Sequence, residues 1–559
     1  MDQDSKSESY WKPEPELRQH LYDAVPGILD SQKANGQFGT EPWIPADQNV
    51  LLPLSAAWEL PDSPYFRDDR VLESIVRGGN ALINQQDADG AWTNRKKEGS
   101  TWGQHHMPWT YSRWIRAYHL IRAAVDEPSR KRWDEALLLG FEAISKAYFT
   151  RMHNQPAHFA MALYCAGEVF GRAEWKKQSA EFMARVADDQ TPHGWWAEHG
   201  GPVVSYNFVY MEALGTYFGM SGDEYVLDAL DRGARYHANF TYPDGSVVET
   251  ADGRNPYQRD IRLRGPGFSH TAIGRGYQAR QHALFRKTGK LFSADYAAHE
   301  LLYGGEGPTE ETTAERHRHV YRMGDEVGIL RHRPWLCCAS AIALPPPDTR
   351  WGQDRQNFLS VFHDDIGLIL GGGNTKLQPL WSTFTVGNTS LMRHIPGDDD
   401  PDFSPRDGLV HVPEKATYEV SEHCLNVEMT YGDVGCKVAS EVVDETEIHL
   451  IYETSGHANL PVEAHVPLFR QTDAVVTLSS GISLALDETP FEHTGEDWLE
   501  HGGYRLYIPR IARLMWPAMP HNPYRKGGEG TVEEGLLVVA VPFPTGIDRQ
   551  VLRLKTSSS

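Results

Sequence analysis

The first half of the chain repeats one pattern, in which predicted helices are joined alternately by short and by long connections. Stretches such as RWIRAYHLIRAAV and VYMEALGTYFGM place apolar residues at i, i+3, i+4 and i+7, as amphipathic helices do. The units recur roughly every 50 residues, which is typical of repeat architectures. In a ring of antiparallel helix pairs, alternate connections fall at opposite ends, so the long ones share one rim. The short connections lie near Pro64, Pro128, Gly167, Gly222 and Gly289.

The long connections are rich in Gly, Trp, His and Asn. Binding and catalytic residues concentrate on loops that a rigid scaffold holds in place. We therefore expect an incomplete (α/α) toroid of about five or six helical hairpins, with a cleft along the rim that the long connections share. These connections cover residues 36–49, 86–109, 149–158, 190–207 and 243–270.

The second half of the chain changes period. From about Arg318, apolar and polar residues alternate with a period near two in stretches such as CKVASEVVDETEIHLIYET, and Gly, Asp and Pro punctuate them. This pattern predicts a large antiparallel β-sandwich, so the expected class is a multidomain α+β protein. The expected division is a catalytic toroid over 1–303, a linker over 304–317 and the β-sandwich over 318–559.

Composition excludes several classes of function. Lys and Arg number 54 against 76 Asp and Glu, and the formal charge of −22 argues against a general nucleic-acid or membrane binder. The sequence contains no apolar run long enough for a transmembrane helix. The N-terminal segment lacks the features of a signal peptide, so we expect a cytoplasmic protein, or a periplasmic or secreted one if a signal was removed. Five cysteines without a CxxC pair suggest neither a disulfide scaffold nor zinc, and no metal or cofactor is expected. The oligomeric state stays open.

A helical toroid followed by a β-sandwich resembles the polysaccharide lyases of the heparinase II/III and alginate-lyase type. The segment HNQPAHFAMALYCAG (153–167) is similar to the Asn–His segment that opens an inner helix of that group. WWAEHGGPVVSYNFVYMEALGTYF (195–218) resembles the segment that supplies the lyase tyrosine, and DGSVVETADGRNPYQRD (244–260) resembles a rim loop. Two departures stand out. Gln155 follows the Asn where many of these lyases have His, and RWGQDRQN replaces the metal segment of the sandwich, so no zinc site is carried over.

The resemblance implies β-elimination on a uronic-acid-containing polysaccharide or oligosaccharide. Such a site must stabilise the uronate carboxylate as charge develops, and must supply a base for the α-proton and an acid for the leaving oxygen. Asn154 is expected to bind the carboxylate, and Tyr206 to act as the acid. His158 or His199 is expected to act as the base or to lower the pKa of Tyr206. All four lie on the predicted rim.

The loop that follows Asp252 carries a local excess of arginine in an acidic chain. The segment 254–275 has a single acidic residue, Asp260, against five arginines: Arg254, Arg259, Arg262, Arg264 and Arg275. The guanidinium fork of arginine matches carboxylate or sulfate geometry. The expected partner is therefore an anionic polysaccharide. The predicted substrate-binding residues are Trp102, His106, Arg113, Trp196, Tyr210, Arg254, Tyr257 and Arg264.

Other interpretations stay open at this point. Asn154 is also a good helix-capping residue, His158 could be an interior histidine, and tyrosines at helical spacing are often core residues. A glycoside hydrolase on the same toroid would need two carboxylates, for which Glu198, Asp244, Glu249 and Asp252 are available. A non-catalytic glycan-binding protein would use the same aromatic and arginine residues for capture alone.

Overall fold

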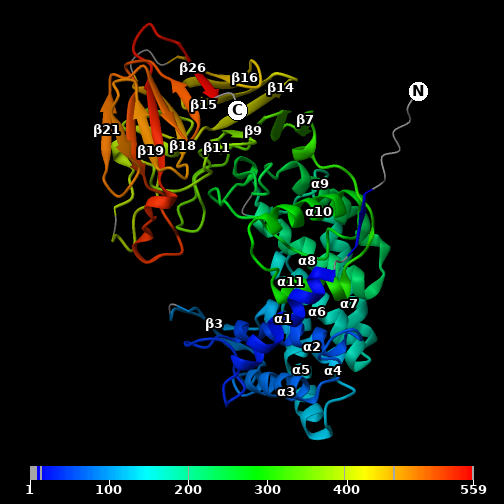
Figure 1. Cartoon of the computed structure of the whole chain (residues 1–559). Coiled ribbons are helices and arrows are strands. Elements are labelled where there is room, and N and C mark those ends of the chain that lie inside the picture. Colours follow the sequence, from blue (N-terminus) through cyan, green and yellow to red (C-terminus); the bar gives the residue numbers. More distant parts are fainter. Residues whose placement is uncertain are drawn as a thin grey trace, which may run out of the picture. The chain divides into compact units, whose positions relative to one another are not determined.

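The computed structural model describes residues 9–12, 15–97, 99–198, 201–395, 397–456 and 460–556. The chain forms two compact units, one helical and one β-rich (Figure 1). The helical unit comprises Met1–Trp196, Ser205–Tyr236 and Leu263–Glu310, and the β unit comprises Ala197–Val204, His237–Arg262 and Glu311–Ser559. Two short segments of the first half thus pack within the β unit, which a single cut near residue 304 does not anticipate.

In the described part of the chain, the helical unit holds α1 (Pro15–Asp30) followed by five helical hairpins. The predicted short connections join the two helices of each hairpin, as the sequence pattern indicates. No helix there is long and apolar enough to cross a membrane. The hairpins are α2 (Leu51–Glu59) with α3 (Asp69–Ile83), α4 (Pro108–Ile121) with α5 (Glu127–Ala147), α6 (Asn154–Phe170) with α7 (Ala173–Asp188), α8 (Val204–Ser221) with α9 (Leu227–Asn239), and α10 (Ala272–Lys287) with α11 (Ala294–Tyr303).

The helices α4, α6, α8 and α11 run in the same direction, as paired contacts along them show. Between α4 and α6, Trp109 lies beside His158 and, further along both helices, Ile115 lies beside Cys165. Between α6 and α8, His158 contacts Val209, and the rings of Tyr164 and Tyr217 follow at 5.3 Å. Between α4 and α11, Arg113 meets Asp295 and Arg116 meets His299. The N-terminal ends of these inner helices therefore share one rim. Long connections lead into α4, α6 and α8 at this rim, whereas α11 begins there after the short connection near Gly289.

Burial explains why these segments are inner helices. In α6, apolar residues surround the whole helix, and nearly all of them are buried, as expected for a helix enclosed on every side. Close contact between the inner and outer layers needs small residues. Gly140 of α5 is one, because a Cβ there would collide with the hydroxyl of Tyr111 on α4.

Two antiparallel sheets form the β unit. Within the described residues, the larger sheet has 11 strands and the smaller has nine. The larger follows the order β21 (Phe491–Thr494), β24 (Arg513–Ala518), β25 (Leu536–Pro542), β18 (Val462–Phe469), β11 (Gly367–Leu370), β10 (Leu359–His363), β9 (Trp335–Ser340), β8 (Val327–His332), β7 (Arg318–Met323). In addition, β12 (Phe384–Gly387) pairs with β18, and β13 (Leu409–Val410) pairs with β12. The smaller follows β14 (Lys415–Val420), β15 (Cys424–Tyr431), β16 (Val434–Val442), β17 (Glu447–Ser455), β26 (Arg549–Thr556), β23 (Tyr504–Tyr507), β22 (Trp498–His501), β19 (Val475–Leu478), β20 (Ser483–Ala485).

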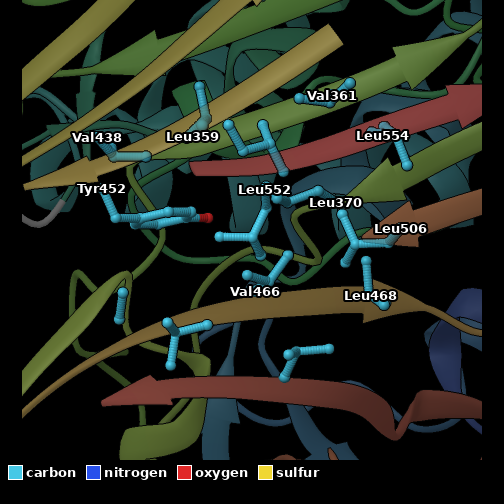
Figure 2. Close-up of a cluster of buried hydrophobic side chains, with 14 of the residues drawn as sticks. Leu359, Val361, Leu370, Val438, Tyr452, Val466, Leu468, Leu506, Leu552 and Leu554 are labelled. Carbon is cyan, nitrogen blue, oxygen red and sulfur yellow. The ribbon is translucent and has the colours of Figure 1, made fainter. Parts of the chain in front are cut away.

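The core of the β unit comes from the period-two alternation that the sequence shows. In β15 and β17, every second residue is buried. Leu359, Val361 and Leu468 of the larger sheet pack in one hydrophobic cluster with Tyr452 and Leu552 of the smaller (Figure 2). The predicted fold class, a helical toroid followed by an antiparallel β-sandwich, is confirmed.

Candidate functional site

The rim at the N-terminal ends of the inner helices gathers polar and aromatic side chains. Trp109 and Asn154 lie in the first turns of α4 and α6, and Tyr206 and Asp295 lie in those of α8 and α11. The positive end of the helix dipole lies at each of these termini. Four parallel helices therefore present partial positive charge at this rim, which stabilises a negatively charged group. We call the rim at the N-terminal ends of α4, α6, α8 and α11 the mouth.

Asn154 does not occupy the capping position of its helix. It is the first residue of α6, whereas the cap is His153, which makes no side-chain capping hydrogen bond. The Asn154 side chain is 6% exposed. The helix-cap interpretation of this asparagine is thus not what the structure shows. The neighbouring Gln155 bonds the His105 side chain, at the end of the strand that leads into α4.

Tyr206 is half-buried in the first turn of α8, the inner helix next to α6. The predicted catalytic His199 lies outside the described residues, so the structure gives it no position. Of the predicted catalytic residues, Asn154 and Tyr206 are the two that begin neighbouring parallel helices at the same rim.

His158 is an interior histidine, which corrects its expected place on the open rim. It is fully buried one turn below Asn154, and its Nε2 lies 3.2 Å from the carbonyl oxygen of Val209. Its ring packs against Trp109 with centroids 5.6 Å apart. Burial lowers its pKa to about 4, so the imidazole is neutral near neutral pH. Without access to the mouth, it cannot itself take a proton from a substrate.

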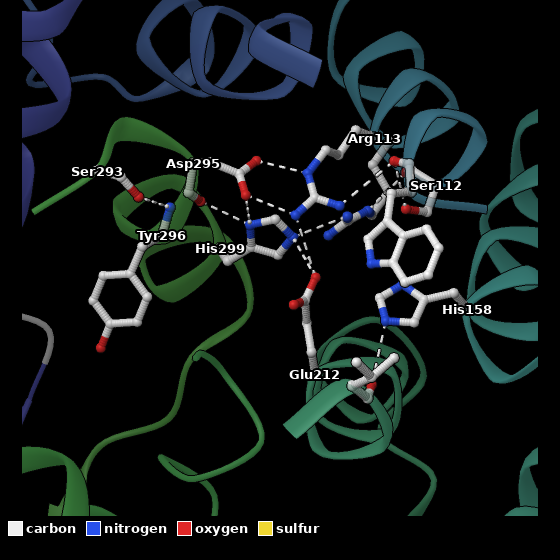
Figure 3. A network of polar contacts seen from close by, with 11 residues as sticks. Ser112, Arg113, His158, Glu212, Ser293, Asp295, Tyr296 and His299 are labelled. Carbon is white, nitrogen blue, oxygen red and sulfur yellow. Dashed lines mark hydrogen bonds and ion pairs between the residues drawn. The ribbon is translucent and has the colours of Figure 1, made fainter. Parts of the chain in front are cut away.

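Directly below the mouth, charged side chains from several helices meet in a network that is buried except at Asp295, whose side chain is 38% exposed (Figure 3). Arg113 of α4 donates from Nε and Nη2 to the two oxygens of Asp295 of α11, both at 2.7 Å. Arg113 Nη2 also lies 3.4 Å from Glu212 of α8. Arg116 Nη2 lies 3.0 Å from His299 Nε2, which is 3.6 Å from Glu212. We call this set the central cluster; it comprises Arg113, Arg116, His158, Glu212, Asp295 and His299.

The central cluster balances its charges internally. Burial by itself raises the pKa of Glu212, but Arg113 and the adjacent histidines bring it down to about 2. Against the same burial effect, Arg113 holds the pKa of Asp295 well below its usual range. Burial lowers the pKa of His299 to about 4. Near neutral pH two cations therefore face two anions. Arg113, 6% exposed and held by two carboxylates, belongs to this cluster and not to the predicted substrate surface.

Three more predicted binding residues lie in the core of the helical unit. Trp196 and Tyr210 are 1% and 2% exposed, and their rings stack on each other at 4.8 Å. The Trp196 indole donates to the carbonyl of Val186. His106 is 9% exposed, and its ring nitrogens meet the Tyr148 hydroxyl and the Asp89 carbonyl. These side chains offer no free face to a sugar, which corrects the prediction.

Trp102 and Arg264 of the helical unit are exposed, as a binding role requires. Trp102 is 58% exposed on strand β3 (Thr101–His105). The other two predicted binding residues, Arg254 and Tyr257, belong to the β unit and line a pocket of about 300 Å³ there.

The pocket of the β unit is built around the loop that follows Asp252. This buried carboxylate accepts hydrogen bonds from the backbone N–H groups of Val204, Arg254 and Asn255. Arg254 Nη2 lies 3.2 Å from the Tyr524 hydroxyl. Sequence analysis missed Tyr524 because it comes from a sandwich loop far along the chain, with no local pattern to mark it. Phe469, Trp381 and His521 also line the pocket.

Three of the four carboxylates that a glycoside hydrolase would use, Asp244, Glu249 and Asp252, accept hydrogen bonds within the β unit. Glu249 is 2% exposed, accepts hydrogen bonds from the Gly372 N–H and the Tyr242 hydroxyl, and has its pKa raised to about 7 by burial. Asp252 is equally buried. Asp244 accepts bonds from the backbone and hydroxyl of Ser246. Within the described ranges, no three His, Cys, Asp or Glu side chains converge to hold a metal ion.

Comparison with known proteins agrees with this architecture. Residues 68–255 match the family model of the ulvan lyase N-terminal domain. No curated protein sequence matches the chain. Among solved structures, the chondroitin AC lyase of Streptomyces coelicolor A3, in complex with chondroitin sulphate, is similar with a TM-score of 0.56 at 12% identity; the match covers 98% of this chain and 81% of that one.

Two further solved structures share the fold. A Paenibacillus xanthan lyase has a TM-score of 0.57 at 11% identity, and the match covers 99% of this chain and 58% of that one. Heparinase III has a TM-score of 0.51 at 11% identity, with 98% and 86% covered. The resemblance predicted from the sequence is confirmed: the chain has the fold of the toroid-plus-sandwich polysaccharide lyases, and a third of it matches the model of an ulvan lyase domain.

Proposed function

We propose that the protein is a polysaccharide lyase that cleaves a uronic-acid-containing polysaccharide by β-elimination at the rim of its helical unit. The observation that carries the proposal is the placement of Asn154 and Tyr206. Both begin neighbouring inner helices that run parallel, at a mouth where several helix N-termini meet. An amide donor and a phenol are the groups that the reaction needs there.

In this mechanism the Asn154 amide donates a hydrogen bond to the uronate carboxylate, and the helix termini stabilise the charge that builds up on it. A base removes the proton on C5, the C4–O bond breaks, and a double bond forms between C4 and C5. Tyr206 gives its proton to the leaving oxygen. His199 is the proposed base, since His158 is enclosed. Trp102 and Arg264 remain the proposed substrate contacts of the helical unit, and Arg254 and Tyr257 remain proposed contacts within the β unit.

The test is a panel of ulvan, chondroitin sulfate, xanthan and heparan sulfate, followed by the ultraviolet absorbance of the unsaturated uronyl product. We expect absorbance to rise with at least one polymer, and ulvan is the first candidate because of the matched domain. Tyr206→Phe should lose turnover by orders of magnitude with unchanged circular dichroism. New reducing ends without ultraviolet absorbance would instead identify a hydrolase, and binding without either product a glycan-binding protein.

A further inference from the structure

A hairpin of the helical unit stands out because it carries exposed side chains on a fixed frame. It consists of β2 (Trp92–Arg95) and β3, joined by a turn, and we call it the arm. In Figure 1 the arm projects from the helices at the label β3. At its base, Trp92 is 1% exposed and its indole donates to the Leu82 carbonyl at 2.9 Å. The arm is therefore rooted in the helical core.

The turn of the arm is attached as well. The Lys97 ammonium lies 2.6 Å from an Asp47 carboxylate oxygen and donates to the carbonyls of Thr40 and Pro42 at 2.9 and 3.1 Å. Asp47 is largely buried, with 13% of its side chain exposed, so the pair is partly shielded from solvent. Attachment at both ends makes the arm a rigid platform, and rigid groups lose less entropy when they bind.

The free face of the arm combines a flat ring with cations. Trp102 has more than half of its surface exposed, and the Lys96 ammonium lies 4.5 Å from the centre of its ring. Arg95 is exposed at the end of β2, where it pairs with Thr101, the residue before Trp102. Arg95, Lys96 and Lys97 follow one another in the sequence. An aromatic ring stacks on the apolar side of a sugar, and a cation close to the ring attracts a carboxylate or sulfate.

The arm also borders the proposed reaction site. Its second strand runs through Met107 into α4, whose N-terminus forms part of the mouth. At the end of that strand, the His105 side chain bonds Gln155, the residue after Asn154. A polymer held at the mouth therefore has the arm beside it.

We infer that the arm is an outer binding subsite for an acidic sugar of the polymer, with Trp102 stacking under the ring and Lys96 and Arg95 pairing with its anionic group. This inference rests on the proposed function and deepens it. A subsite outside the reacting pair of sugars makes long chains better substrates than short oligosaccharides. Lys97 and Asp47 act as positioning residues, because they hold the platform without touching the sugar.

Binding can be measured apart from catalysis by native electrophoresis through gels that contain ulvan or chondroitin sulfate, with all variants in the Tyr206→Phe background. Trp102→Ala and Lys96→Gln should each weaken retardation by about three- to tenfold in apparent affinity. Trp102→Phe should keep most of the apparent affinity for the polymer, and Asp47→Asn should lose less of it than Trp102→Ala does. Tyr225→Ala and Lys177→Gln are matched controls: Tyr225 is also 58% exposed but follows the C-terminal end of α8, and Lys177 lies on outer helix α7.

In the active enzyme, Trp102→Ala should raise KM for polymer several times more than it raises KM for a tetrasaccharide, with little change in kcat for the polymer. Equal retardation of the arm variants and the controls would overturn the inference, as would absence of retardation of the parent by any acidic polymer. Retardation that depends on Trp102 without ultraviolet product from any polymer would leave the arm standing and overturn the proposed function.

Discussion

Arg113 and Asp295 join helices α4 and α11 through two parallel hydrogen bonds of 2.7 Å, although 182 positions separate them in the sequence. The same guanidinium reaches Glu212 of α8. One arginine thus ties together three of the helices whose N-termini form the mouth. The geometry of that mouth depends on a cluster that lies below it.

Replacing Arg113 tests this dependence. Arg113→Met leaves the buried Glu212 without the arginine that contacts it, and breaking a buried pair from one side costs about 3–5 kcal/mol. We expect a loss of that size in the free energy of unfolding of the helical unit, measured by urea denaturation. Arg113→Lys keeps the charge but loses the two-point contact, so its free energy of unfolding should lie between those of the parent and of Arg113→Met. A loss below about 1 kcal/mol in Arg113→Met would contradict the role assigned to the cluster.

The central cluster also makes stability depend on acid. The folded pKa of His158 and His299 is about 4 against 6.5 for a free histidine, so the unfolded chain takes up protons first as pH falls from 6.5 to 4. Glu212, with a pKa of about 2 against 4.5, adds stability above pH 4.5 that is lost as pH falls further. Both effects destabilise the folded state in acid, by about 3 kcal/mol for each titrating group when complete.

Urea unfolding at pH 7.0, 5.5 and 4.5 measures this decline. His158→Gln, which cannot titrate, should be less stable than the parent at pH 7 but should lose less stability between pH 6.5 and 4.5. Parallel pH curves for the parent and the variant would show that His158 titrates normally in the folded protein.

Glu249 should make the stability of the β unit depend on pH in the opposite direction, with the free energy of unfolding falling as pH rises. Its folded pKa of about 7 lies above the unfolded value of 4.5, so its contribution is complete below pH 4.5 and is lost as pH rises through 7. Glu249→Gln removes the charge but can keep the contacts with Gly372 and Tyr242. The stability difference between variant and parent should therefore move in favour of the variant by about 1 kcal/mol from pH 6 to pH 8. A difference independent of pH would refute the raised pKa.

Trp196 offers a contrast with Trp102. Because Trp196 is buried against Tyr210, Trp196→Ala should destabilise the helical unit by about 3–5 kcal/mol. Trp102→Ala, at an exposed site, should change stability by less than about 1 kcal/mol. Thermal unfolding of both variants separates the two roles. Equal melting temperatures of the two variants would contradict the structure, in which Trp196 is buried and Trp102 is exposed.

The repeating architecture was readable from the sequence because it rests on local signals. The alternation of short and long connections indicated the helical hairpins, and the change to period two indicated the sandwich. The roles of individual residues were less accessible. Trp102 and Trp196 look alike in sequence, since both lie within long polar connections, and only tertiary packing buries one of them. Arg113 was predicted to bind substrate. Its carboxylate partners come from helices far along the chain, and no local sequence pattern indicates them.

The central cluster has one more consequence. Arg116 and His158 are completely buried between the inner helices, so side chains fill the centre of the helical unit at that level. Under the proposed function, a polymer would therefore lie across the rim and would not pass between the inner helices. An interior bond of a long chain could then reach that rim without a free end.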